Sequence, residues 1–125
     1  MTKKKILVVD DNNALLEMLT EFLTSNDYHV VACDSGTEAL EQFNDFMPDI
    51  VLTDVVMPGF DGIELLLKLR TINPELRVVV MSGGNRGHAD TYLHMADKLG
   101  ANLVLNKPFE LAELLAQLEK FEVAS

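Results

Sequence analysis

The chain alternates five times between a short apolar run and a longer segment whose apolar residues recur at helical spacing. The apolar runs, each predicted to be a buried strand, are Ile6–Val9, His29–Cys33, Ile50–Thr53, Arg77–Met81 and Leu103–Leu105. The amphipathic segments that follow them lie at residues 15–23, 35–43, 61–70, 89–99 and 111–118. Short apolar strands that alternate with amphipathic helices predict a parallel sheet covered by helices on both faces.

Capping residues indicate where three of these helices begin. Asn12 or Asn13 can cap the first helix, and Ser35 followed by Glu38 forms a capping-box pattern for the second. The third helix opens near Asp61. Its many apolar residues predict a broad face toward the core, with a contact to a partner as the alternative.

Composition limits the functions that are open to the chain. It has 125 residues with a net charge of -10, and 48% of the residues are hydrophobic. This length suits one domain, which we expect to span residues 1–125 with no effector domain. A surface this acidic repels phosphate backbones and anionic lipids, so direct binding to nucleic acid or to a membrane is not expected.

The only cysteine, Cys33, lies in an apolar run and cannot form an internal disulfide. We interpret it as a small buried residue, consistent with a reducing cytoplasm. The apolar run that follows Lys5 is too short for a signal peptide, and no run is long enough to span a membrane. We therefore expect a cytoplasmic protein.

Polar side chains occur at the ends of four of the five predicted strands. Asp10 and Asp11 follow the first strand, Asp54 ends the third, Ser82 follows the fourth, and Lys107 lies just beyond the fifth. The carboxyl ends of parallel strands line one edge of a sheet, and this is where ligands bind in open α/β sheets. We therefore expect these residues to meet at one site.

The predicted set of side chains is suited to phosphate chemistry. Carboxylates held close together repel, and Mg²⁺ relieves the repulsion by binding a couple of carboxylates, several waters and a phosphate oxygen. Lys107 supplies a positive charge for phosphate, Ser82 can donate a hydrogen bond, and Gly83 and Gly84 allow backbone amides to approach closely. A carboxylate such as Asp54 in this setting can attack phosphorus and form an acyl phosphate.

Each of these residues also has an ordinary structural explanation when it is taken alone. Asp10 and Asp11 suit a turn or a helix start, Ser82 suits a turn, and Lys107 suits a solvated surface. Coincidence at four strand ends is much rarer than at one, so we prefer the functional interpretation. The three histidines show no spacing typical of metal ligands, so zinc is not expected.

Four motifs together resemble a known family. They are Val9-Asp10-Asp11, the stretch from Asp54 to Gly62 that contains Met57-Pro58-Gly59, Met81-Ser82-Gly83, and Lys107-Pro108-Phe109. In this order and spacing they resemble the receiver domains of two-component response regulators, most of all the single-domain kind typified by the chemotaxis response regulator. The resemblance runs from Lys5 to about Phe121. The combination is highly specific, although any one motif alone is weak.

The resemblance implies a fold and a function. The fold would be a flavodoxin-like, doubly wound (βα)5 sandwich with a parallel five-stranded sheet in the order 2-1-3-4-5. Asp54 would be the phosphoacceptor, phosphorylated in a Mg²⁺-dependent reaction by a sensor histidine kinase or a phosphotransfer protein. Ser82 and Lys107 would contact the phosphoryl group, and the Lys107–Pro108 peptide bond would be cis. Such a domain is no classical enzyme, since it only gains and loses its own phosphoryl group.

The resemblance also implies a set of metal ligands. Asp11, Asp54 and the backbone carbonyl of Val56 would hold Mg²⁺, and Asp10 would act largely through water. No other cofactor is implied.

The sequence departs from the family pattern in two respects. Family members usually carry Tyr or Phe three residues before the lysine, where this chain has Val104. The aromatic side chain whose rotation is coupled to the hydroxyl residue in the family is therefore absent here. Family members also often place a polar side chain two residues after the phosphoacceptor or two after the hydroxyl residue, and these positions are Val56 and Gly84. Neither can position an attacking water, so we expect slow self-dephosphorylation.

Three functions compete on these grounds. The first is a phosphoryl-switched module that binds a downstream protein through its fourth helix, fifth strand and fifth helix, a face that includes Tyr92, Leu93 and Val104. The second is a phosphorylation-independent binding module on the same fold, which the Val104 departure keeps open. The third is an aspartate-nucleophile phosphatase or a flavin protein. Adjacent acids in place of Asp-x-Asp, and the lack of a Ser/Thr/Gly-rich loop after the first strand, argue against it.

Overall fold

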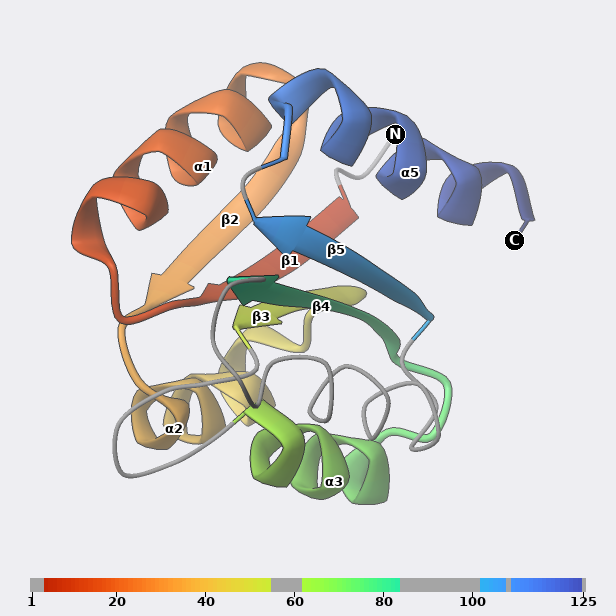
Figure 1. The fold of residues 1–125 in the computed structure, drawn as a ribbon. Coiled ribbons are helices and arrows are strands. Elements are labelled where there is room, and N and C mark those ends of the chain that lie inside the picture. The colour runs from red at the N-terminus through yellow and green to blue at the C-terminus, as the bar shows by residue number, and fades with distance from the viewer. Residues whose placement is uncertain (1–3, 55–61, 84–101, 108, 125) are drawn as a thin grey trace.

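The computed structural model describes residues 4–54, 62–83, 102–107 and 109–124. These residues form strands and helices in alternation (Figure 1). The elements are β1 Lys4–Val9, α1 Asn13–Ser25, β2 Tyr28–Cys33, α2 Gly36–Phe46, β3 Ile50–Asp54, α3 Gly62–Ile72, β4 Arg77–Gly83, β5 Leu103–Lys107 and α5 Leu111–Ala124. The helix predicted at residues 89–99 lies outside the described residues.

The strands form one parallel sheet in the order β2-β1-β3-β4-β5, which confirms the predicted order. Because all pairs are parallel, the carboxyl ends of the strands lie along the same edge. The pairing places Asp54 opposite Met81 and Gly83 opposite Lys107. The ends of β3, β4 and β5 are thereby brought together.

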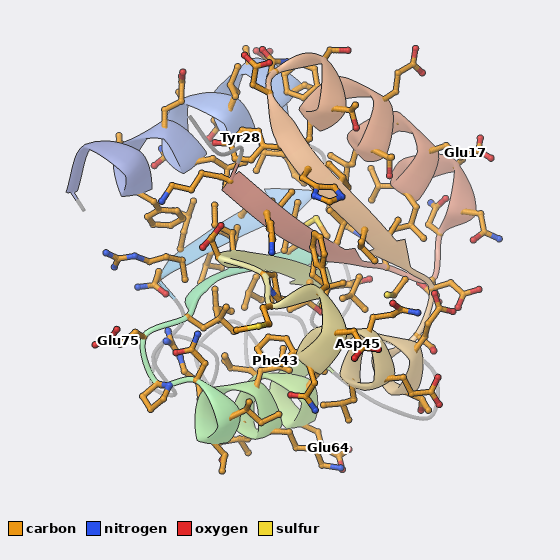
Figure 2. All side chains as sticks on the ribbon, turned by 180° about the vertical axis from the view of Figure 1, so that it is seen from behind. Glu17, Tyr28, Phe43, Asp45, Glu64 and Glu75 are labelled. Carbon is orange, nitrogen blue, oxygen red and sulfur yellow. The ribbon has the colours of Figure 1, made fainter. Side chains whose placement is uncertain are left out.

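The sheet separates two hydrophobic cores, with α1 and α5 on one face and α2 and α3 on the other (Figure 1). Side chains alternate between the faces along each strand, so Ile6 and Val8 join one core and Leu7 and Val9 the other. Figure 2 shows Phe43 pointing inward between α2 and α3. The core with α2 and α3 contains Leu7, Val9, Cys33, Ala39, Phe43, Val51, Leu65, Leu66, Leu69, Leu76, Val78 and Val80. The other contains Ile6, Val8, Leu16, Leu19, Leu23, Tyr28, Ile50, Leu52, Val79, Met81, Leu105, Leu114 and Leu118.

The caps of the first two helices follow the sequence signals. Asn12 caps α1, because its side chain accepts a hydrogen bond from the Leu15 amide, which decides between the two asparagines. Ser35 caps α2 by accepting from the Glu38 amide at 3.1 Å. Met47 caps the carboxyl end of α2, and its φ of 52° places a residue other than glycine in the left-handed region.

The third helix presents a broad face to the core, as predicted. Leu65, Leu66 and Leu69 are buried, whereas Leu67 and Ile72 are each 49% exposed. All five strands are longer than the apolar pattern predicts, by one or two residues each. β1 begins at Lys4, β2 begins at Tyr28 and β3 ends at Asp54. β4 continues through Ser82–Gly83 and β5 through residues 106–107, because the ladder of backbone hydrogen bonds does not require apolar side chains. None of the helices in the described part of the chain is long and apolar enough to cross a membrane.

Candidate functional site

Three carboxylates meet at the carboxyl edge of the sheet. Asp10 directly follows β1, Asp54 is the last residue of the neighbouring strand β3, and Asp11 comes next to Asp10 in the chain. One carboxylate oxygen from each lies within 4.8 Å of the others. Asp10 and Asp54 are buried and Asp11 is exposed, so the cluster opens to solvent on the Asp11 side. The predicted convergence of these three acids is therefore present in the structure.

Lys107 joins this cluster from β5, two strands away from β3 in the sheet. Its Nζ atom lies 2.5 Å from Asp10 Oδ2 and 3.3 Å from Asp54 Oδ2. The side chain of Lys107 is 23% exposed, that of Asp54 is 11% exposed and that of Asp10 is fully buried. The ammonium group therefore bridges two carboxylates in a partly desolvated setting, where charge interactions are stronger than at an open surface.

Both carboxylate oxygens of Asp10 are engaged. Oδ2 binds Lys107, and Oδ1 accepts a hydrogen bond of 2.9 Å from the backbone amide of Asn12. The Asp10 amide donates to the Cys33 carbonyl of β2 at 3.1 Å. The sequence indicated Asn12 only as a cap for α1. The backbone amide of Asn12 has a second role, because it donates to the Asp10 side chain two residues earlier, a common local hydrogen bond of aspartate in turns.

These contacts explain how buried carboxylates are tolerated at the sheet edge. An unpaired buried charge costs several kcal/mol, and one ammonium offsets that cost for two carboxylates only in part. Three carboxylates and one ammonium leave the described part of the cluster with a net negative charge. A cation at this edge would reduce the remaining repulsion.

The donor set fits Mg²⁺. This ion takes oxygen ligands at about 2.0–2.1 Å, so neighbouring ligands lie about 3–4 Å apart, and it keeps several waters. Oxygens from three carboxylates within 4.8 Å of one another come near this spacing, and exposed Asp11 leaves room for water. Asp10 is the least available of the three acids because its oxygens already bind Lys107 and Asn12.

The remaining predicted site residues are only partly described. Ser82 lies in β4 opposite Asn106, and only its backbone is described, so its hydroxyl stays a prediction. Val56, Gly84 and the Lys107–Pro108 peptide bond lie outside the described residues. Val104 lies in β5, half-buried, opposite Val80 of β4.

Comparison with known proteins agrees with this geometry. The profile of the response regulator receiver domain matches residues 6–119. The chain belongs to the response regulator receiver domain family. Receiver domains are the signalling domains of two-component systems, and the sheet order 2-1-3-4-5 is the one expected for this receiver.

Two curated relatives match nearly the whole receiver. The response regulator receiver protein CpdR of Brucella abortus is 34% identical over 123 residues, which are 98% of this chain and 99% of CpdR. Sporulation initiation phosphotransferase F of Bacillus subtilis is 32% identical over 121 residues, 97% of this chain and 95% of that protein. Among solved structures, the chemotaxis response regulator CheY4 of Vibrio cholerae superposes with a TM-score of 0.85 at 26% identity, covering 95% of this chain and 98% of CheY4.

Proposed function

We propose that this receiver is a phosphoacceptor whose Asp54 takes a phosphoryl group from the phosphohistidine of a sensor histidine kinase or a phosphotransfer protein. A carboxylate oxygen of Asp54 attacks phosphorus, the phosphorus–nitrogen bond breaks, and the histidine nitrogen leaves with the bonding electron pair. The observation that carries the proposal is the position of Lys107, whose ammonium lies 3.3 Å from Asp54 at the edge where Asp10 and Asp11 also meet.

Each neighbouring group would have a defined task in this transfer. Lys107 would neutralise negative charge on the phosphoryl oxygens, and the Ser82 hydroxyl would donate a hydrogen bond to one of them. Asp11, Asp54 and the carbonyl of Val56 would hold Mg²⁺, with Asp10 acting through water and Lys107. The bound ion would supply charge neutralisation during the transfer.

The proposed output is a change in protein contacts. Phosphate on Asp54 adds negative charge beside Lys107 and so would bias β5, α5 and the fourth helix that the sequence predicts at residues 89–99, which lies outside the described residues. We propose that a downstream protein, and not nucleic acid, reads this surface in the cytoplasm. The chemistry of the receiver itself would be limited to accepting and losing its own phosphoryl group. Val104 in place of an aromatic residue is the one feature that favours a phosphorylation-independent binding module instead.

Labelling of Asp54 tests the proposal. Purified protein is incubated with radiolabelled acetyl phosphate and Mg²⁺, and the expected product carries an acid-stable, base-labile label of one phosphoryl group per chain. Asp54→Asn should remove the label, whereas Asp45→Asn, at an exposed position of α2, should retain it. Chelation of divalent ions with EDTA should also prevent labelling.

Two results would count against the phosphoacceptor role. One is the absence of label in the folded unmodified protein with both acetyl phosphate and phosphoramidate, which would favour the phosphorylation-independent module. The other is label that persists in Asp54→Asn, which would place the acceptor elsewhere. Circular dichroism of each variant shows whether the fold is retained.

A further inference from the structure

The strand β2 leaves one side of the sheet open. It is the terminal strand and pairs with β1 alone within the described part of the chain. Edge strands are usually protected from pairing with other chains by lysine, proline, a bulge or a covering element. The sequence of β2, Tyr-His-Val-Val-Ala-Cys, contains neither lysine nor proline, and its register with β1 is continuous over six residue pairs.

The alternation of the backbone shows which peptide groups face outward. The Cys33 carbonyl accepts a hydrogen bond from the Asp10 amide, so the peptide groups of Cys33 face β1. Successive residues of a strand direct their N–H and C=O groups to opposite sides. Those of Val31 therefore also face β1, and those of Val30 and Ala32 face away from the sheet.

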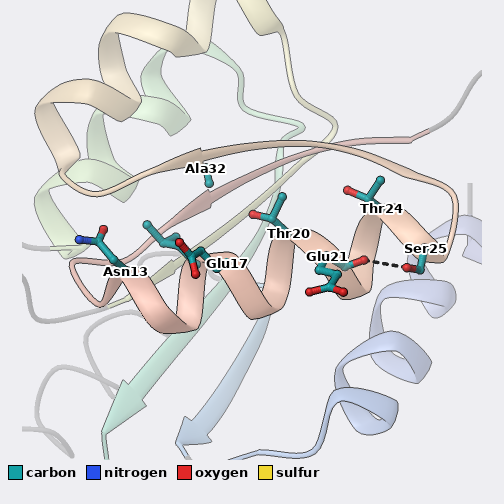
Figure 3. Close-up of a pocket in the computed structure, with 8 residues that line it drawn as sticks. Asn13, Glu17, Thr20, Glu21, Thr24, Ser25 and Ala32 are labelled. Carbon is teal, nitrogen blue, oxygen red and sulfur yellow. Dashed lines mark hydrogen bonds between the residues drawn. The ribbon is translucent and has the colours of Figure 1, made fainter.

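A groove runs beside this edge, between α1 and β2. Its volume is about 680 Å³, and its lining includes Glu17, Thr20 and Thr24 of α1 and Ala32 of β2 (Figure 3). The small Ala32 side chain on the strand and the short threonines on the helix leave this space open. The groove follows α1 from Asn13 to Ser25, about 20 Å at 1.5 Å per residue, which matches six residues of extended chain.

Both charged residues that line the groove, Glu17 and Glu21, are acidic, and the nearest lysines in the sequence, Lys4 and Lys5 of β1, pair with the first residues of β2. The sequence has no lysine or arginine between Lys5 and Lys68, so β1, α1, β2, α2 and β3 contribute only acidic charge beyond Lys5. Glu17 and Glu21, one helical turn apart, both line the groove and are exposed. A second copy of this chain, with a net charge of -10, would be repelled from this face. A cationic occupant would be attracted.

We propose that the groove between α1 and the outer edge of β2 is a docking site for an extended, lysine- or arginine-rich segment of a partner protein. The segment adds a strand to β2 by hydrogen bonding with the peptide groups of Val30 and Ala32, and its basic side chains contact Glu17 and Glu21. Backbone pairing supplies affinity and the acidic rim selects for charge. The site is separate from Asp54, so it does not depend on the phosphoacceptor proposal.

The test uses the full chain and a defined probe, the octapeptide (Lys-Val)4, observed by nuclear magnetic resonance. Binding is expected to shift the amide signals of β2 and α1 and to slow hydrogen exchange at Val30 and Ala32. The same peptide methylated at every backbone nitrogen keeps its charge but has no backbone donors, and it should bind about tenfold more weakly, or 1.4 kcal/mol. The octapeptide (Glu-Val)4 should not bind.

Matched charge reversals locate the site. The double variant Glu17→Lys/Glu21→Lys is expected to weaken (Lys-Val)4 binding about tenfold or more. The double variant Glu113→Lys/Glu119→Lys changes the net charge equally at exposed positions of α5 and should leave the affinity within about twofold.

Several results would overturn the proposal. Undiminished binding of the N-methylated peptide, equal loss in both double variants, or signal shifts spread over the whole surface would show charge attraction without strand pairing. An absence of (Lys-Val)4 binding at millimolar concentration would also overturn it. A dimer in sedimentation, together with slowed hydrogen exchange at Val30 and Ala32 without peptide, would assign the edge to a second copy instead.

Discussion

Lys107 and Asp10 are 97 positions apart in the sequence, yet they form an ion pair with 2.5 Å between Nζ and Oδ2. The same ammonium lies farther from Asp54, at 3.3 Å. Asp10 is fully buried, and removal of Lys107 would leave its charge without this partner. Lys107 is therefore shared between an acid that orients it and the acid that we propose is phosphorylated.

Mg²⁺ is expected to stabilise the fold. Because the ion binds the folded carboxylate cluster and not the unfolded chain, free Mg²⁺ at tenfold its Kd should raise the free energy of unfolding by about 1.4 kcal/mol. The measurement is urea denaturation at constant ionic strength. Asp11→Ala should abolish the gain, whereas Asp45→Ala, at an exposed position of α2, should keep it. An equal gain in both variants would show that the ion acts elsewhere.

The phosphorylated receiver is expected to lose its phosphoryl group slowly. Val56 and Gly84 offer no polar side chain to orient an attacking water. Labelled protein, freed of donor and kept with Mg²⁺, should retain label for much longer than minutes. Val56→Asn should shorten the half-life about tenfold or more, while Val56→Leu should not. Loss of label from the unmodified protein within minutes would contradict this prediction.

The buried thiol of Cys33 should make stability fall at alkaline pH. Burial, followed by the nearby Glu38 carboxylate, raises the pKa of Cys33 to about 12. Above the unfolded thiol pKa of about 8.5, the unfolded chain loses this proton while the folded chain keeps it, so the contribution present below that pH declines as pH rises toward 12. Between pH 8 and 10 the stability advantage of the unmodified protein over Cys33→Ala should shrink by about 2 kcal/mol. Urea denaturation measures it, and a pH-independent difference would contradict it.

Arg70 is expected to stabilise the fold near the amino-terminal end of β4, at the opposite end of the strands from the acid cluster. Its guanidinium donates to the carbonyls of Pro74 and Leu76 and to the Asn102 side chain, which also accepts from the Val78 amide. Arg70→Met should therefore reduce the free energy of unfolding by about 1 kcal/mol, since three acceptors, of which the Leu76 carbonyl is part-buried, lose a charged donor.

The matched control for Arg70 is Lys120→Met, which removes one exposed cation from α5. It should change stability by less than about 0.5 kcal/mol. Comparable losses in the two variants, measured by urea denaturation, would mean that total charge and not these hydrogen bonds matters.

The fold could be predicted from the sequence because the spacing of the hydrophobic residues distinguishes buried strands from amphipathic helices. Strand runs such as Ile6–Val9 and helical spacing in residues 15–23 leave few arrangements other than a covered parallel sheet. The ends of β4 and β5 were harder to predict. Ser82 and Lys107 belong to their strands by backbone pairing, and polar side chains give no hydrophobic signal for it.

The site was accessible in outline because strand ends converge in a parallel sheet. Position at a strand end could not distinguish Asp10 from Asp11, since both follow β1 directly, and only the family resemblance predicted different roles for them. The side-chain geometry separates a buried Asp10, bound to Lys107 and Asn12, from an exposed Asp11. Arg70 gave no signal either, because its acceptors are mainly backbone carbonyls that any sequence possesses.

The double engagement of Asp10 has a consequence for the selectivity of ion binding. With Oδ1 held by the Asn12 amide and Oδ2 held by Lys107, this carboxylate is preorganised before any ion arrives. Little rotamer entropy of the Asp10 side chain then remains to be lost when an ion binds. A fixed carboxylate cannot rearrange to complete a larger shell of ligands, so the site favours binding of an ion that keeps several of its own waters.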